Sequence, residues 1–165
     1  METSFPTLAR WSVWANQRLY EACRILSDEE YFAPRACAFG SIHRTLNHLL
    51  ATDRIWLARL TGEAHSIPSL DYEICTDFAS LCDARAREDR RIIRVIDEAV
   101  AGKGLSDDLH YSSMDGKPQR LLRCLVLSHL FLHHAHHRGQ VHALLSQTSV
   151  PPPALDLTYF PRMAP

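Results

Sequence analysis

Five of the ten histidines in this 165-residue chain fall within nine residues, from His129 to His137. His133 and His137 are four residues apart, in a segment whose apolar pattern indicates a helix. On an α-helix that spacing places two imidazoles on one face, about one turn apart. Two histidines placed in this way can bind one metal ion, as they do in zinc-binding helices. The spacing therefore predicts a metal site that needs a further ligand from elsewhere in the chain.

We expect the third ligand to be His48, which lies in an apolar segment at residues 46–50. Three neutral imidazoles leave coordination positions open for water or substrate, as catalytic metal sites do. A bound cation would lower the pKa of a coordinated water or deprotonate a coordinated thiol. His129, one turn before His133, is the candidate for a fourth protein ligand, which would close the site and favour a structural role.

Each of these histidines also has a simpler explanation. A single histidine on an apolar face can be a hydrogen-bonded core residue, and pairs four residues apart also occur by chance. A dense histidine tract can bind metal adventitiously at the surface. We expect that surface position for His134 and His136, which point away from the stripe that holds His133 and His137.

Asp53 is a carboxylate in the middle of an otherwise apolar helical seam. A buried carboxylate is costly unless it is paired or hydrogen-bonded. Two roles remain open for it. Asp53 can pair with Arg138 or another arginine, or it can accept the free ring N–H of a metal-binding histidine. It is also the only obvious candidate for a general base near the predicted site.

Four segments with apolar residues at spacings of three and four predict helices, at about residues 6–26, 41–60, 72–101 and 120–147. Ser41 is suited to cap the second helix at its start and Gly62 to end it. The pair Asp115-Gly116 predicts a short β-hairpin or an irregular loop before the last helix. Four helices with modest connections predict one all-α domain over residues 1–165, a four-helix bundle.

The last predicted helix is apolar or small on nearly all sides. Beside the histidine stripe lies a face of mostly small residues: Leu125, Ser128, Leu132, Ala135, Gly139 and Ala143. Small residues let another helix approach closely, and Gly139 costs about 1 kcal/mol relative to alanine in a helix, which indicates a packing reason. We therefore expect this helix to be buried, either within the chain or against a second subunit.

The overall composition argues against several classes of protein. The formal net charge is −1, whereas nucleic-acid binding needs clustered basic charge, so no nucleic-acid partner is expected. The densest charge run, residues 83–91, mixes both signs and is interpreted as a solvated helix face. The five cysteines include no CxxC pair, so neither a disulfide framework nor a four-cysteine zinc site is expected. They are interpreted as packing residues.

The sequence also predicts where the protein resides. No run of about 18 apolar residues occurs, so no membrane span is expected. The start of the chain, Met1 to Pro6, lacks a basic region followed by an apolar run, so no signal peptide is expected. A cytoplasmic protein with reduced thiols is the resulting prediction.

Several segments of the chain, taken in order, resemble the DinB family among the DinB/YfiT-like metalloenzymes. The most specific is the block from His133 to Gln140, in which Arg-Gly-Gln follows the histidine pair, combined with an upstream Asn-His-x-x-x-x-Asp pattern that ends at Asp53. The segments that carry the resemblance are residues 14–20, 41–56, 115–116, 133–142 and 152–157.

The resemblance implies an up-down-down-up four-helix bundle that is often a homodimer. It also implies a divalent metal, most often zinc or nickel, bound by three histidines. Transferred by position, these are His48, His133 and His137. Some relatives in the wider superfamily are transferases or isomerases that use low-molecular-weight thiols such as bacillithiol or mycothiol.

Three functions follow as hypotheses. The first is thiol S-transfer, in which the metal binds a small thiol and presents it to an electrophile. The second is metal-dependent hydrolysis, with Asp53 as the general base. The third is non-catalytic, a metal-stabilised dimer that acts as a stress-response binding module. The family name refers to induction after DNA damage and not to DNA binding, which agrees with the near-neutral charge.

Overall fold

The computed structural model describes residues 5–102 and 104–160. Residues 1–4, which carry part of the signal-peptide prediction, lie outside this range. The elements in chain order are α1 (Phe5–Arg24), α2 (Asp28–Phe32), α3 (Ile42–Thr61), α4 (Phe78–Ala101), β1 (Asp108–Ser112), β2 (Pro118–Leu122) and α5 (Arg123–Leu145), with 3-10 turns at Gly104–Ser106 and Leu157–Tyr159. Within the described ranges, no helix is both long and apolar enough to cross a membrane.

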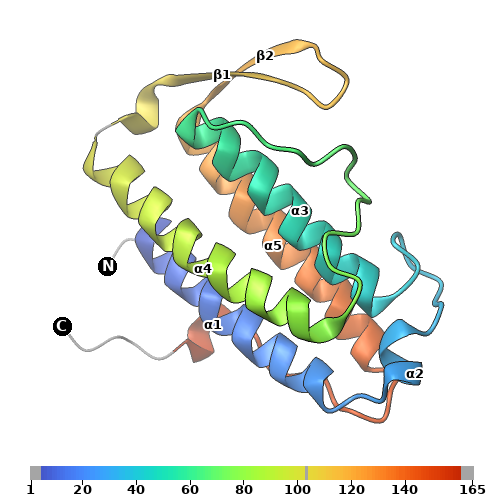
Figure 1. The fold of residues 1–165 in the computed structure, drawn as a ribbon. Helices are drawn as coiled ribbons and strands as arrows, with labels where there is room; N and C mark the ends of the chain where they lie inside the picture. The colour runs from blue at the N-terminus through green and yellow to red at the C-terminus, as the bar shows by residue number, and fades with distance from the viewer. Residues whose placement is uncertain (1–4, 103, 161–165) are drawn as a thin grey trace.

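The four long helices form the predicted bundle. Helices α1 and α5 run in one direction, while α3 and α4 run in the other, which is the up-down-down-up arrangement (Figure 1). Helix α1 packs against α4, and α3 packs against α5; further contacts join α3 to α4 and α1 to α5. The strands β1 and β2 pair antiparallel beyond one end of the bundle (Figure 1). The all-α fold with a short hairpin before the last helix is therefore confirmed.

The helix boundaries follow local capping chemistry. Helix α3 begins after Ser41, whose side chain accepts the N–H of Arg44, and it ends at Gly62, where φ is +74°. The predicted start of the third helix, at residue 72, is wrong. Helix α4 begins six residues later because the Asp77 side chain accepts the N–H of Ser80 and caps it there. Helix α5 likewise begins at residue 123 rather than 120, because residues 118–122 pair in the hairpin.

The middle of the bundle is polar. One apolar cluster, which includes Leu19 and Leu46, lies toward α2, and a second, which includes Leu57 and Leu127, lies toward the hairpin. Along each long helix, buried polar side chains occupy the positions between the two clusters. This polar layer consists of Ser12, Asn16, Asp53, Arg85, Asp89, His134 and Arg138.

The interpretation of residues 83–91 as a solvated face is wrong for three of its members. Arg85, Glu88 and Asp89 are buried, whereas Asp83 and Arg87 are exposed as expected. The three buried groups are tolerated because each lies within ion-pair distance of an opposite charge. A mixed charge run on α4 therefore serves partly as core.

One face of α5 is exposed in the single chain, so this helix is not fully buried within the chain, and its burial against a second subunit stays a prediction. The side chain of Leu132 is 70% exposed and that of Leu125 is 53% exposed. A Cβ added at Gly139 would meet no atom within 4 Å, so close packing within the chain does not explain this glycine. We call this surface, which includes Leu125, Leu132, Ala135 and Gly139, the α5 outer face.

Candidate metal centre

The structure brings the three predicted histidines together between α3 and α5. The Nε2 atom of His48 lies 3.2 Å from Nε2 of His133 and 3.2 Å from Nε2 of His137. One ligand atom from each of the three lies within 4.8 Å of the others. The i,i+4 pair on α5 and the single histidine on α3 thus meet across the helix interface, in an arrangement compatible with metal binding.

Hydrogen bonds at Nδ1 of His48 and His137 determine whether the Nε2 atom of each ring faces the centre with a lone pair or with a proton. The carbonyl oxygen of Leu70 accepts a hydrogen bond from Nδ1 of His48 at 2.7 Å. Nδ1 therefore carries the proton, and neutral His48 presents a lone pair at Nε2. Nδ1 of His137 donates in the same way to Oε1 of Gln140 at 2.8 Å. The amide nitrogen of Gln140 is also held in place, because Gln140 Nε2 lies 3.1 Å from Nε2 of His136.

Two nitrogen lone pairs, on His48 and His137, therefore face each other. This arrangement is repulsive unless a cation lies between them. With metal–nitrogen bonds of about 2.05 Å, tetrahedral ligand nitrogens lie about 3.3 Å apart. The observed separation of 3.2 Å matches that value. The donor atoms and their spacing therefore fit a divalent metal ion.

The environment keeps these imidazoles unprotonated. Burial lowers the pKa of His48. Burial, together with the neighbouring rings of His137 and His48, lowers the pKa of His133 to about 3. Burial is also the main cause that lowers the pKa of His137 to about 4. Neutral imidazole is the form that binds metal, so the site is ready to bind an ion at neutral pH.

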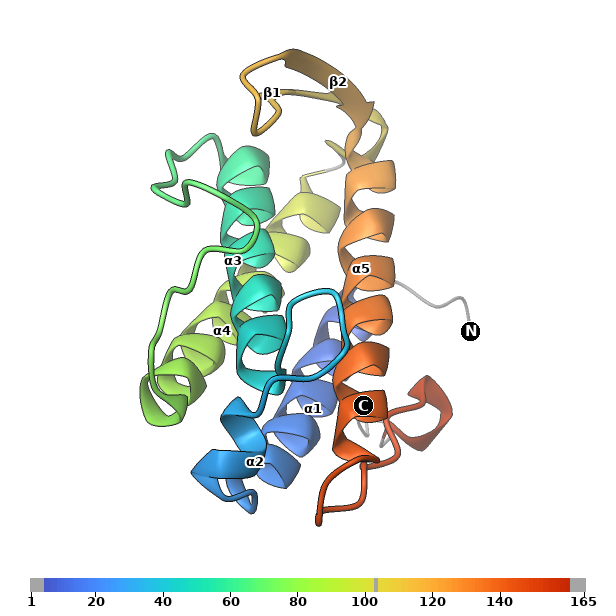
Figure 2. The same cartoon turned by 90° about the vertical axis from the view of Figure 1, so that its right-hand side faces the viewer.

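Aromatic side chains line two sides of the centre. The ring of Phe39 stacks on His48 with centroids 4.0 Å apart and meets His137 edge-on at 5.6 Å. Phe39 lies in the segment between α2 and α3, which passes in front of the α3–α5 interface in Figure 2. On the other side, His129 lies between His133 and Trp56, with centroid distances of 5.6 and 5.3 Å.

No fourth protein ligand joins the group within residues 5–102 and 104–160. His129 contacts the ring of His133 but does not belong to the set of converging ligand atoms. None of the described cysteines or carboxylates belongs to it either. Three ligands leave at least one coordination position for an exchangeable molecule.

Asp53 lies in the polar layer and not at the metal centre. Its side chain is fully buried. Its Oδ2 accepts a hydrogen bond from Arg85 Nη1 at 2.5 Å, and its Oδ1 accepts one from His134 Nε2. Burial alone would raise the pKa of Asp53, but His134 and Arg85 outweigh it and hold the pKa at about 2. Asp53 therefore pairs with an arginine, Arg85, which is one of the two roles predicted for it. It makes no hydrogen bond to the three site histidines, so it is not placed to orient a ligand or to act as a base there.

The surface position predicted for His134 is wrong, whereas that for His136 is confirmed. His134 is 1% exposed because both ring nitrogens have partners inside the bundle. Arg138 Nη1 donates to Ser12 Oγ at 2.7 Å, so the Ser12 hydroxyl is free to donate to His134 Nδ1, also at 2.7 Å. His134 Nε2 then donates to Asp53.

Sequence reasoning missed three contributors to the site. Gln140 had a usable signal, because it lies three residues after His137 and so shares its helix face. Phe39 and the carbonyl of Leu70 come from loops, where periodicity gives no information about neighbours. Their roles depend on how the segments before and after α3 return to the bundle.

Comparison with known proteins agrees with this fold. The model of the DinB family matches residues 1–165. Among solved structures, a DinB-like protein from Bacillus cereus ATCC 10987 is similar with a TM-score of 0.64 and 18% sequence identity, over 86% of this chain and 90% of that one. At that identity the likeness bears on the fold alone. No curated protein matches the chain.

Proposed function

The chain belongs to the DinB family, and on that premise we propose that it is a cytoplasmic metal-dependent transferase of a low-molecular-weight thiol. The ion would be divalent, zinc or nickel, held by His48, His133 and His137. The main observation in support is that three Nε2 atoms converge without a fourth protein ligand in the described part of the chain. A structural metal site is usually closed by four protein ligands, whereas a catalytic one keeps a position open.

The chemistry that the ion supplies when bound is deprotonation of a coordinated thiol at neutral pH. In the overall reaction the thiol sulfur bonds to an electrophilic carbon, the leaving group departs with its bonding electrons, and the thiol proton is released to solvent. The protein's own residues orient the ligand set, since Leu70 and Gln140 fix the proton on Nδ1 of His48 and His137. The ring of Phe39 covers one face of the His48 ring.

Removing one site histidine is expected to abolish both metal binding and turnover. Untagged wild type should hold about one divalent ion per chain by elemental analysis. It should also consume bacillithiol, mycothiol or cysteine with 1-chloro-2,4-dinitrobenzene faster than the metal-free protein. His137→Ala should hold no ion and show only the uncatalysed rate, because two imidazoles remain at a site that needs three.

The control is His110→Ala, which removes an exposed histidine from β1, outside the converging set. It should retain the ion and the activity. Equal metal content in wild type and His137→Ala would show adventitious binding and contradict the metal site. A bound ion that leaves thiol consumption unchanged would contradict the transferase and favour a non-catalytic, metal-stabilised binding module.

We further propose that the protein is a homodimer joined through the α5 outer face. This face exposes Leu125 and Leu132 together with small residues, which would allow a second helix to approach closely. Leu132→Glu is expected to convert a species of twice the chain mass of 18.8 kDa into a monomer, measured by light scattering after size exclusion. The control Ile25→Glu alters an exposed apolar side chain after α1 and should stay dimeric. A wild type that is monomeric, or a dimeric Leu132→Glu, would contradict this interface.

A further inference from the structure

The segment between α3 and α4, residues 62–77, supplies the Leu70 carbonyl that accepts the N–H of the His48 ring. It returns along α3 toward the start of α4 (Figure 2). Within the described residues, every hydrogen bond that ties residues 64–76 to the rest of the chain goes to a side chain of α3. These side chains are His43, Asn47 and His48. The position of the Leu70 carbonyl therefore depends on how α3 holds this segment.

Asn47 holds the segment by the backbone of Cys75. Its Oδ1 accepts the N–H of Cys75 at 3.0 Å, and its Nδ2 donates to the Cys75 carbonyl at 3.1 Å. Because Cys75 presents one backbone donor and one acceptor, only one orientation of the Asn47 amide satisfies both. Asn47 is 1% exposed, so water does not compete for this amide. It is also the first residue of the Asn-His-x-x-x-x-Asp pattern, and neither the three metal ligands nor the polar layer accounts for it.

The nearer contacts of Leu70 do not fix its carbonyl by themselves. Leu70 is 47% exposed, so packing of its side chain does not hold it. It lies in a tight turn in which the N–H of Tyr72 donates to the carbonyl of Ser69 at 3.3 Å. The contact between Glu73 and His43 is partly open to water, because the Glu73 side chain is 40% exposed, and such contacts contribute little.

Two firm anchors therefore flank the turn. Before it, Ile67 is buried in an apolar cluster with Ala51 and Ile55 of α3. After it, Asn47 holds Cys75, which is five residues beyond Leu70 along the chain. The Leu70 carbonyl is held against α3 by the short stretch of backbone between these anchors.

We propose that Asn47 is a positioning residue of the metal centre. By holding Cys75, it keeps the Leu70 carbonyl against Nδ1 of His48. A neutral imidazole can carry its proton on either nitrogen, and the hydrogen bond at one nitrogen selects the form. With the carbonyl in place, the proton stays on Nδ1 and a lone pair at Nε2 faces the centre. The inference rests on the proposed metal site, although the His48 proton can be located without any metal.

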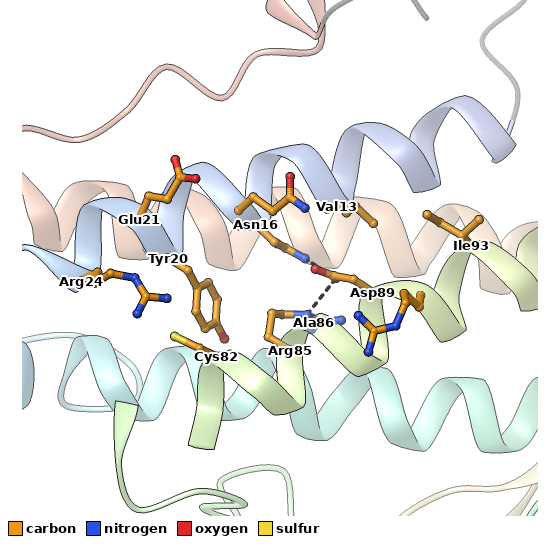
Figure 3. Close-up of a pocket in the computed structure, with 12 residues that line it drawn as sticks. Val13, Asn16, Tyr20, Glu21, Arg24, Cys82, Arg85, Ala86, Asp89 and Ile93 are labelled. Carbon is orange, nitrogen blue, oxygen red and sulfur yellow. Dashed lines mark hydrogen bonds and ion pairs between the residues drawn. The ribbon is translucent and has the colours of Figure 1, made fainter. Parts of the chain in front are cut away.

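The first measurement locates that proton by nitrogen NMR of isotope-labelled histidine rings in the full, metal-free chain. The His48 signal is identified by its absence in His48→Ala. Wild type should carry the proton on Nδ1. Asn47→Ala should share it between Nδ1 and Nε2, because the carbonyl is no longer held in place. The matched control is Asn16→Ala, which removes another buried asparagine with two partners, Asp89 (Figure 3) and Arg138. It should keep the proton on Nδ1.

An insertion tests the same role without removing a buried side chain. Two glycines between Tyr72 and Glu73, which are both exposed, lengthen the backbone between the turn and the Asn47 anchor. Exposed loops tolerate such insertions, so the chain should still fold. The insertion should release the His48 proton from Nδ1, as Asn47→Ala does.

The control insertion places two glycines between Ala64 and His65. Both residues are exposed and belong to the same segment, but they precede the Ile67 anchor. The stretch between the two anchors keeps its length, so the proton should stay on Nδ1 of His48.

Zinc affinity gives the second readout. Asn47→Ala and the insertion after Tyr72 should each weaken zinc binding about tenfold, the lower end of the range for residues that orient metal ligands. Asn16→Ala and the insertion after Ala64 should bind zinc as wild type does.

Three results would overturn the proposal. They are a folded Asn47→Ala that keeps both the Nδ1 proton of His48 and the wild-type zinc affinity, an insertion after Tyr72 that has no effect, and equal changes in Asn16→Ala. The last result would show a general loosening of the bundle. A wild type that binds no zinc would contradict the proposed function and not the role of Asn47, which the His48 proton would then decide alone.

Discussion

Zinc is expected to raise the free energy of unfolding of the wild-type chain by about 4 kcal/mol when the free ion is a thousandfold above its dissociation constant. His48→Ala should remove that increment. The reason is that the three Nε2 atoms converge only in the folded chain, where His48 on α3 meets the pair on α5. An ion that binds the folded state and not the unfolded one stabilises the fold by mass action. Urea unfolding at buffered zinc concentrations measures the effect.

The comparison within each variant, with and without zinc, separates metal binding from damage to the fold. His48→Ala should lose the zinc dependence whatever its stability in the metal-free state. His129→Ala is the matched control, because His129 lies on the same stripe of α5 but outside the converging set. It should keep the full increment. Loss of the increment in His129→Ala would identify it as a fourth ligand, and its survival in His48→Ala would contradict the assigned site.

The second large effect is expected at Asp53, in the polar layer. Asp53→Ala should cost about 3–5 kcal/mol of stability, because removal of one partner from a buried ion pair leaves the other uncompensated. Here the N–H of His134 and the Nη1 of Arg85 would both lose their acceptor inside the bundle. Urea unfolding of the metal-free protein gives the value without any contribution from the ion.

Asp97→Ala provides the control for this loss. Asp97 also pairs with an arginine, Arg10, but both side chains are partly exposed, so the change should cost less than about 1 kcal/mol. Similar losses in the two variants would contradict the buried network.

The contribution of Asp53 also depends on pH. Its folded pKa of about 2 is below the ordinary value of 3.8, so its stabilisation is present above about pH 4 and is lost as the pH falls toward 2.

The sequence predicted the bundle well because its signals are local. Ser41 and Gly62 bound α3 through hydrogen bonds within a few residues of the helix ends. Gly116, with φ of +78°, supports the hairpin turn in the same way. The i,i+4 spacing of His133 and His137 fixes their common face whatever surrounds the helix. Predictions that needed only the neighbours along the chain were therefore reliable.

The failures concern which helix face is buried, which depends on other helices. His134 looked like a surface residue because its partners, Ser12 and Asp53, lie on α1 and α3. Arg85 and Asp89 looked solvated because mixed charges are typical of exposed faces, and nothing in α4 itself reveals the carboxylate of Asp53 opposite. The pattern of a single helix does not contain this information.

The three candidate metal ligands are unevenly spread along the chain, with consequences for how fast the fold is lost. His133 and His137 share one helix, so their relative position is set as soon as α5 forms, whereas the three-histidine site is complete only when His48 joins them. His48 is 85 residues away from His133, and closing a loop of that length costs about 4 kcal/mol in chain entropy. An ion bound by all three histidines would link α3 to α5, and that link would have to break before the helices part. The metal would then act as a reversible cross-link that lengthens the lifetime of the native state by slowing the unfolding step.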